Sequence, residues 1–195
     1  ITHNFDFSWM EYSFGLQPEV NQFDAAKCMD VAGADIYHPS QEHLTGAEIA
    51  FGGAVARSLK KENYLVLETQ AQGRLTWLPY PGQLRLQAYS HLSSGANSIM
   101  YWHWHSIHNS FESYWKGILS HNLKPNTTYH ELKAFGAEAH LLEKHLINLH
   151  KDCKAAIIID NASLTGLDEF PIYEEGAQSI GYNHILRQFY DACYQ

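Results

Sequence analysis

Short apolar runs alternate with longer amphipathic stretches along the chain. A first strand-like piece ends at residues 2–5, and further apolar runs predict strands over 33–37, 64–67, 96–104 and 154–160. A continuous apolar run is typical of a strand buried on both faces, as in a parallel sheet. The amphipathic stretches predict helices over 22–32, 45–61, 81–94, 129–149 and 181–194. Strands and helices that alternate in this way predict an α/β fold with a parallel sheet.

The long helix predicted to end near residue 150 is followed by a new apolar run at 154. This order predicts two domains. Residues 1–150 would form the first, and residues 151–195 would begin a second α/β domain.

Composition excludes several classes of protein. The chain has 195 residues, a net charge of −8, 17% charged residues and 13% aromatic residues. Few charges and many aromatic side chains argue against disorder, and the acidic balance argues against nucleic-acid binding. No apolar run approaches the ~20 residues of a membrane span. Three widely spaced cysteines predict free thiols in a reducing compartment, so we expect a cytoplasmic protein.

Polar side chains follow each apolar run, at the strand ends where parallel sheets carry their chemistry. Glu68 comes directly after the run 64–67, and a carboxylate there is costly to bury. It is either a salt-bridged strand-end carboxylate or a catalytic one. Gln70, Gln72 and Trp77 follow closely. Amides, an acid and an indole face are the mixture that sugar sites use, which favours a catalytic role.

The segment 102–108 contains three histidines, His103, His105 and His108. They could supply three imidazoles to a metal. Alternation along a strand would place His103 and His105 on one face and the neighbouring tryptophans on the other. No HExxH pattern and no nearby Asp or Cys cluster supports a metal, so hydrogen bonding to a neutral polyol is the other interpretation.

Six spaced motifs resemble the glycoside hydrolase family 42 β-galactosidases. They are Thr2–Phe5, Asp35–Tyr37, Leu67–Gln70, Pro81–Arg85, Gly95–Ser106 and Phe111–Gly117, in the family's order. The resemblance covers residues 1 to about 121. Beyond residue 150 the chain resembles the start of the family's second domain, an α/β module associated with trimer assembly.

The resemblance implies part of a TIM barrel, a retaining mechanism and a terminal β-D-galactosyl substrate. Glu68 matches the catalytic nucleophile, and its charge would need nearby donors such as a His or Arg85. The other residues that the resemblance places at the substrate are Tyr37, Trp77, His105, Glu112 and Trp115. Trp115 is a departure, because many members have His at this position, three residues after the Glu that Glu112 matches.

The family's acid/base is a Glu that follows Asn at the end of the fourth barrel strand. No Asn-Glu dipeptide precedes Glu68 here. The resemblance therefore aligns this chain with barrel strands five to eight, places the acid/base before Ile1, and implies that the isolated chain is inactive. The family's metal-binding cysteine cluster has no match, so we expect no cofactor.

The implied partners are a β-galactoside or galacto-oligosaccharide and further copies of the chain, as a trimer in full-length members. We expect no nucleic-acid or membrane partner. Two alternatives stay open: a galactoside-binding module without catalysis, and a metal hydrolase that uses His103, His105 and His108.

Overall fold

The computed structural model describes residues 1–7, 15–38, 45–72, 78–172 and 181–194. Within these ranges the strands are β1 (Asn4–Asp6), β2 (Gly33–Asp35), β3 (Tyr64–Gln70) and β4 (Ala96–Trp102). The helices are α1 (Gln22–Ala26), α2 (Ala47–Lys60), α3 (Gln83–Ser93), α4 (Thr127–Leu146), α5 (Asn161–Glu169) and α6 (Tyr182–Tyr194).

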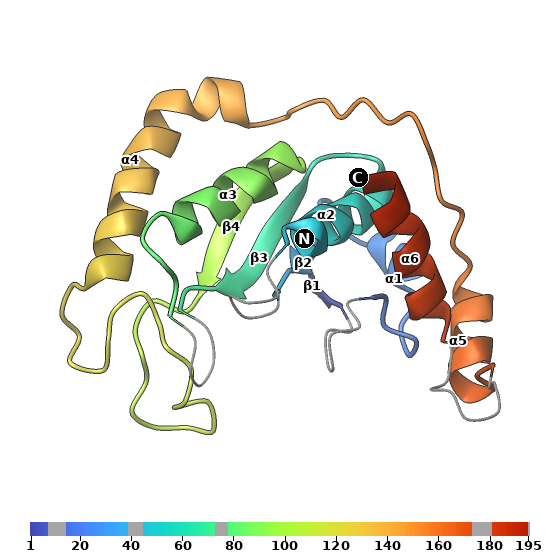
Figure 1. The fold of residues 1–195 in the computed structure, drawn as a ribbon, viewed down its shortest axis with the longest axis horizontal. Coiled ribbons are helices and arrows are strands. Elements are labelled where there is room, and N and C mark those ends of the chain that lie inside the picture. Colours follow the sequence, from blue (N-terminus) through green and yellow to red (C-terminus); the bar gives the residue numbers. More distant parts are fainter. Residues whose placement is uncertain (8–14, 39–44, 73–77, 173–180, 195) are drawn as a thin grey trace.

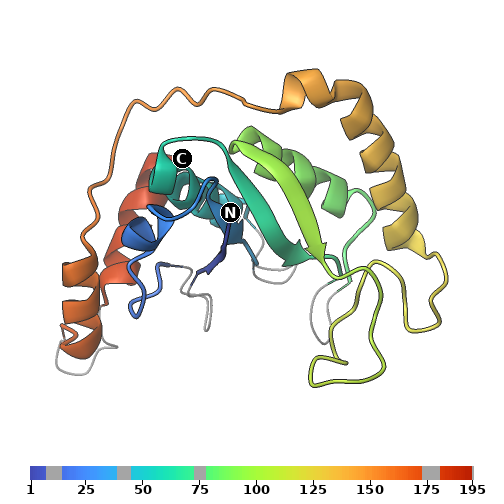
Figure 2. The ribbon, with the colours of Figure 1, turned by 180° about the vertical axis from the view of Figure 1, so that it is seen from behind.

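The strands form one parallel sheet in the order β1-β2-β3-β4. Helices α2 and α3 cover one face of this sheet, and in the view of Figure 2, from behind, β3 and β4 lie in front of these helices. Helix α4 packs beside α3, while α5 and α6 lie at the far side of the molecule near α1 and α2 (Figure 1). Parallel strands end at the same edge of a sheet, so this topology gathers the strand ends that carry polar side chains.

The main core lies between the sheet and α2. Its largest fully buried side chains include Phe7, Ile36, Phe51 and Tyr64. A smaller cluster of Ala88, Leu92 and Phe135 joins α3 to α4. Burial of apolar surface on this scale is the dominant favourable contribution to the fold.

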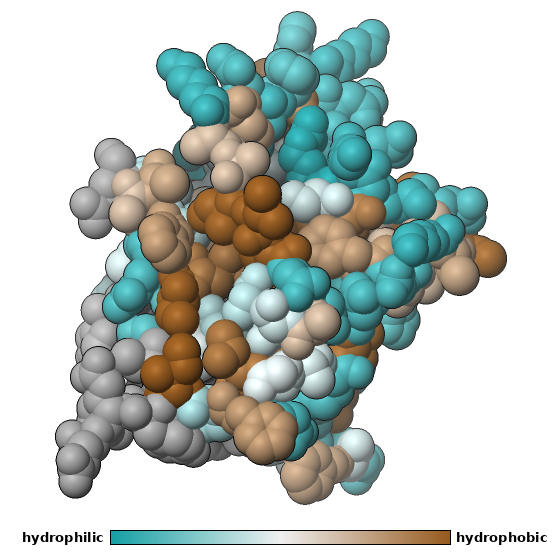
Figure 3. All heavy atoms as spheres, turned by 90° about the vertical axis from the view of Figure 1, so that its right-hand side faces the viewer, coloured by the Kyte–Doolittle hydropathy of each residue, from teal (hydrophilic) through white to brown (hydrophobic). Residues whose placement is uncertain are grey.

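The C-terminal helices contribute to the same main core. Leu164 of α5 and Leu186 of α6 are 2% and 6% exposed and belong to the cluster that contains Phe51. Figure 3 views the molecule from the side of α5 and α6 and shows apolar surface among polar side chains. Phe170, just past α5, and Phe189 of α6 are among the exposed apolar side chains.

The predicted alternation of strands and helices is confirmed over most of the described chain. The helices predicted over 45–61, 81–94, 129–149 and 181–194 correspond to α2, α3, α4 and α6. Gly95, just beyond α3, has a φ of +103°, which a glycine adopts without strain. The first helix is shorter than expected and ends at Ala26.

The strand predicted over 154–160 is wrong. This segment is extended connection that pairs with none of the described strands, and Ile158 is 94% exposed. A strand is stable only when a neighbouring strand takes up its backbone hydrogen bonds. The connection instead runs from α4 across the molecule to α5 (Figure 1).

Candidate active site

The ends of three adjacent strands place four polar side chains together. In the sheet register Asp6 of β1 lies opposite Asp35 of β2, and Asp35 lies opposite Glu68 of β3. Paired residues of neighbouring strands point to the same face, and so does Asn4, two residues before Asp6. Three carboxyl groups and one amide therefore share one face at the end of the sheet.

Glu68 accepts a hydrogen bond on each carboxylate oxygen. The Tyr37 hydroxyl, just past β2, donates to Glu68 Oε2 at 2.8 Å. The Asn4 side-chain nitrogen donates to Glu68 Oε1 at 3.2 Å. Hydrogen bonds of this kind stabilise the ionised form of a carboxyl group.

The sequence-based expectation that Arg85 would serve this purpose is wrong. Arg85 lies on the exposed side of α3, and its Nε is 2.7 Å from Glu138 Oε2 of α4. The donors to Glu68 are two neutral groups, a phenol and an amide. Among the described residues, no cation lies within ion-pair distance of Glu68. The negative charge of Glu68 is therefore not compensated by an ion pair.

Burial raises the pKa of Glu68, and the nearby charge of Glu112 raises it further, while the hydrogen bond from Tyr37 lowers it. Burial also raises the pKa of Asp35 to about 7, with the charge of Glu68 as the next cause. The pKa of the Tyr37 phenol lies well above its ordinary value because of burial and the nearby carboxylates of Glu68, Asp35 and Glu112. These shifts follow from gathering acids in a partly buried place.

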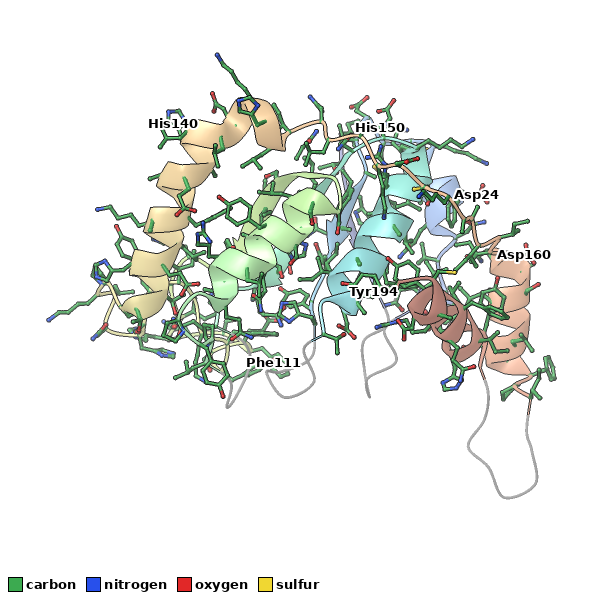
Figure 4. The ribbon with its side chains drawn as sticks, turned by 45° about the horizontal axis from the view of Figure 1, so that its top comes forward. Asp24, Phe111, His140, His150, Asp160 and Tyr194 are labelled. Atoms are coloured by element: carbon green, nitrogen blue, oxygen red, sulfur yellow. The ribbon has the colours of Figure 1, made fainter. Side chains whose placement is uncertain are left out.

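The loop after β4 brings Trp115 to the same place. Trp115 is 9% exposed, and its ring lies 5.6 Å from that of Tyr37, centroid to centroid, at 45°. Figures 1 and 4 show this loop, which contains the labelled Phe111, at the end of the molecule toward which β3 and β4 point. The loop thus borders the strand ends that carry Glu68.

A buried hydrogen-bond network fixes the base of this loop. The Ser106 hydroxyl accepts from the Gly117 amide at 3.0 Å and donates to the Leu119 carbonyl at 3.0 Å. The Gln72 side chain, just past β3, donates to the Gly117 carbonyl at 2.6 Å. The strand that carries Glu68 is therefore tied directly to the loop that carries Glu112 and Trp115.

Three predicted site residues remain to be placed, namely Glu112, His105 and Trp77. Glu112 is half-buried and close enough to Glu68 to influence its pKa. His105 is exposed, and its Nδ1 lies 3.1 Å from the Ser106 carbonyl oxygen. Trp77 lies outside the described residues.

The three histidines do not behave as the alternation predicted. Strand β4 ends at Trp102, so the prediction that His103 and His105 share a strand face is wrong. His108 stacks on His121 with ring centroids 5.5 Å apart. In the part of the chain that the structure describes, no group of three or more His, Cys, Asp or Glu side chains is arranged to hold a metal ion. The metal-hydrolase alternative therefore has no geometric support in these residues.

Two of the residues that contact Glu68 or its neighbours, Asn4 and Asp35, were not singled out from the sequence as site residues. Asn4 donates both to Glu68 and to Asp35, whose Oδ1 and Oδ2 lie 3.0 and 3.2 Å from the same nitrogen. Asn4 lies where the first strand-like piece is predicted to end, and Asp35 lies in the short strand predicted over 33–37. That position was the available signal, but it becomes informative only once the pairing of the strands is known.

Comparison with known proteins shows the family of the chain. The sequence profile of glycoside hydrolase family 42, described as beta-galactosidase, matches residues 1–142. The chain belongs to glycoside hydrolase family 42. Beta-galactosidase LacZ of Heyndrickxia coagulans is 30% identical over 149 residues, which are 73% of this chain and 22% of that protein. Beta-galactosidase BgaA of Planococcus sp. is 28% identical over 189 residues, 93% of this chain and 27% of that protein.

Solved structures of the family share the fold. Gan42B, a GH42 beta-galactosidase from G. stearothermophilus, superposes with a TM-score of 0.83 at 21% identity, over 98% of this chain and 29% of that one. The beta-galactosidase from Rahnella sp. R3 gives a TM-score of 0.83 at 18% identity, over 99% and 28%. The four-stranded parallel sheet and its helices thus match part of the family's catalytic domain.

This family 42 chain spans 22% to 29% of the length of these relatives. Among the helices of the described residues, none has both the length and the apolar character needed to cross a bilayer.

Proposed function

We propose that this chain is part of a retaining β-galactosidase in which Glu68 is the catalytic nucleophile. The observation that carries the proposal is the hydrogen bonding of Glu68 at the end of the parallel sheet. Each of its carboxylate oxygens accepts one hydrogen bond, from Tyr37 and from Asn4. Membership of family 42 supplies the reaction class, and a solved structure of a catalytic mutant of Gan42B shares this fold.

In the proposed reaction the Glu68 carboxylate attacks the anomeric carbon of a terminal β-galactosyl group and forms a glycosyl-enzyme, which water then hydrolyses. A retaining glycosidase needs a second carboxyl group about 5–5.5 Å away as acid and base. The two hydrogen-bond donors on Glu68 favour its ionised form and oppose the rise in pKa that burial causes. No cation among the described residues pairs with Glu68, so its charge would be available to the cationic transition state.

Asp35 is a second carboxyl group that shares the Asn4 amide with Glu68, but its contacts do not suit an acid/base. It is 8% exposed, and the Asn4 amide nitrogen lies within hydrogen-bond distance of both its oxygens. An acid/base must instead reach the leaving oxygen of the substrate and a water molecule. The resemblance to family 42 implies instead that the acid/base lies outside this chain, on a strand before β1, and we propose that β1 to β4 are the fifth to eighth barrel strands.

The residues proposed to contact galactose surround Glu68. Glu112 would accept hydrogen bonds from sugar hydroxyls, and Trp77 and His105 would border the same site. Tyr37 and Trp115 pack against one another beside the nucleophile and would form one wall. Assembly as a trimer, a domain boundary near residue 150 and a cytoplasmic location stay predictions.

The test uses the full-length enzyme that carries these residues. A 2-deoxy-2-fluoro aryl galactoside reacts with a retaining nucleophile but leaves a long-lived glycosyl-enzyme, so peptide mapping identifies the labelled residue. We expect the label on Glu68. Glu68→Gln should abolish turnover of an aryl galactoside while the enzyme stays folded, as cooperative thermal unfolding would show. The matched control is Glu62→Gln, at an exposed position, which should keep full activity.

Two results would contradict the proposal. A label on another residue would remove Glu68 from the nucleophile role. Galactose binding without any hydrolysis by the intact enzyme would instead favour the alternative of a non-catalytic binding module.

A further inference from the structure

The amide of Asn4 contacts two carboxyl groups at once. Its side-chain nitrogen lies 3.0 Å from Asp35 Oδ1, 3.2 Å from Asp35 Oδ2 and 3.2 Å from Glu68 Oε1. A primary amide nitrogen carries two hydrogens. One can therefore be directed at Asp35 and the other at Glu68.

Asn4 has little else to hold its side chain. The residue is exposed and lies on β1, a strand of three residues. Asp35 is 8% exposed and lies on β2, between β1 and β3. A buried acceptor beside an exposed amide favours the rotamer of the amide that satisfies the acceptor, since leaving the acceptor unsatisfied is costly.

The orientation of the amide also matters chemically. Turning the Asn4 side chain over would place its carbonyl oxygen against Glu68, where two acceptors would repel one another. Glu68 enforces the correct orientation only while it is a carboxylate. In the glycosyl-enzyme it becomes an ester and accepts hydrogen bonds more weakly, whereas Asp35 does not react.

We propose that Asp35 is a positioning residue that holds the Asn4 amide as a hydrogen-bond donor to Glu68 throughout the reaction. The proposal rests on the proposed role of Glu68 as nucleophile. Asp35 acts here through Asn4 and touches neither the substrate nor the reacting atoms. Its function is to keep the donor in place when the charge of Glu68 disappears on formation of the glycosyl-enzyme and returns on hydrolysis.

Two other roles for Asp35 make different predictions. Asp35 could simply join β1 to β2, in which case its loss would lower stability without a specific effect on the nucleophile. It could also act on Glu68 directly through its charge, in which case its effect would add to that of Asn4. A double-mutant cycle separates these cases, because residues that act through one shared contact are not additive.

The experiment measures how fast the 2-deoxy-2-fluoro aryl galactoside labels Glu68 in the full-length enzyme. Asn4→Ala and Asp35→Ala should each slow the limiting labelling rate about tenfold, the effect of one hydrogen bond to a charged group. The inhibitor concentration at half the limiting rate should stay unchanged. The double variant should be no slower than the slower single variant.

Two further variants keep the experiment decisive. Asp35→Asn retains an oxygen that accepts from Asn4, so it should recover part of the rate lost in Asp35→Ala; if Asp35→Ala fails to fold, Asp35→Asn takes its place in the cycle. Asp24→Ala removes an exposed carboxylate on α1, far from the loop of Phe111 (Figure 4), and should label at the normal rate.

The outcomes distinguish the two proposals. Labelling of a residue other than Glu68 in the unsubstituted enzyme would overturn both. Labelling of Glu68 with additive effects of the Asn4 and Asp35 variants would overturn only the positioning role. A normal labelling rate in both Asp35 variants would do the same.

Discussion

Asp35 links protonation to the stability of the fold. Burial and the charge of Glu68 raise its pKa to about 7. When folding raises the pKa of an acid, the acid contributes fully to the stability of the folded state only below its pKa in the unfolded state. This contribution is lost as the pH rises through the pKa in the folded state. The thermal midpoint of the full-length enzyme should therefore decrease as the pH rises from about 4 to about 8.

The Asp35→Asn variant tests this pH dependence. It removes the titrating group, so its midpoint should fall less over the same pH range. Asp6 and Glu68, whose pKa values burial also raises, would still contribute a decrease of the same sign. Asp24→Asn, at an exposed position, is the control and should keep the full decrease. A slope in Asp35→Asn equal to that of the control would contradict the assignment.

The Tyr37 hydroxyl should matter to catalysis more than to stability. Tyr37→Phe removes the donor to Glu68 Oε2 but keeps the ring that packs on Trp115. Because a hydrogen bond to a charged group is worth about 1.5–3 kcal/mol, kcat should fall by about 10- to 100-fold with little change in the thermal midpoint. Tyr89→Phe, whose hydroxyl bonds Glu138 on the α3–α4 side, is the matched control. Equal kcat values for the two variants would rule out the role of Tyr37.

Glu68 could be singled out as a candidate from the sequence for a physical reason, and the groups that contact it could not, for a different reason. A carboxylate directly after an apolar run stands out locally, because few sites tolerate it. The importance of Asn4 and Asp35 depends on the register of β1, β2 and β3, which brings residues 31 and 64 positions apart into contact. No local pattern contains that register.

At the scale of elements, the loop after β4 depends on the absence of a side chain at Gly117. A Cβ there would lie 2.5 Å from the His105 carbonyl carbon and 2.7 Å from the Ser106 nitrogen. Both are backbone atoms that cannot move independently. Gly117→Ala should therefore displace the loop that carries Glu112 and Trp115, lower kcat/KM for an aryl galactoside and destabilise the enzyme by about 1–3 kcal/mol.

Gly136→Ala is the matched control for this substitution. Gly136 lies within α4, and a Cβ there would meet nothing within 4 Å. Alanine in a helix interior is favoured over glycine by about 0.5–1 kcal/mol, so this variant should be slightly more stable and fully active. Unchanged kcat/KM in Gly117→Ala would show that the loop does not position the site.

Elements with strong local patterns were predicted well, and the wrongly predicted strand and the helix that was not predicted have separate causes. The run 154–160 has the composition of a strand, but a strand also needs a partner, which composition does not reveal. Helix α5 was not predicted, although Asp160 caps it by accepting from the Ser163 amide at 2.9 Å. That capping pattern was present in the sequence and would have indicated the helix.

At the scale of the whole molecule, α6 is held against α2 by polar as well as apolar contacts. Arg187 of α6 lies 2.9 Å from Glu48 of α2 and 2.7 Å from Asp191, and its guanidinium stands over the Phe51 ring. The Arg187 and Glu48 side chains are 17% and 9% exposed. Removing one partner from so buried a pair leaves the other charge uncompensated.

Arg187→Ala should therefore loosen α6 from the rest of the structure. We expect about 2 kcal/mol less protection, seen as roughly thirtyfold faster amide hydrogen exchange in α6 of the full-length enzyme. Arg85→Ala breaks an ion pair whose side chains are 50% and 39% exposed, and should change exchange in α3 by less than about 1 kcal/mol. Equal protection of α6 in the Arg187 variant and the unsubstituted enzyme would mean that Leu186 and its apolar neighbours hold this helix without the ion pair.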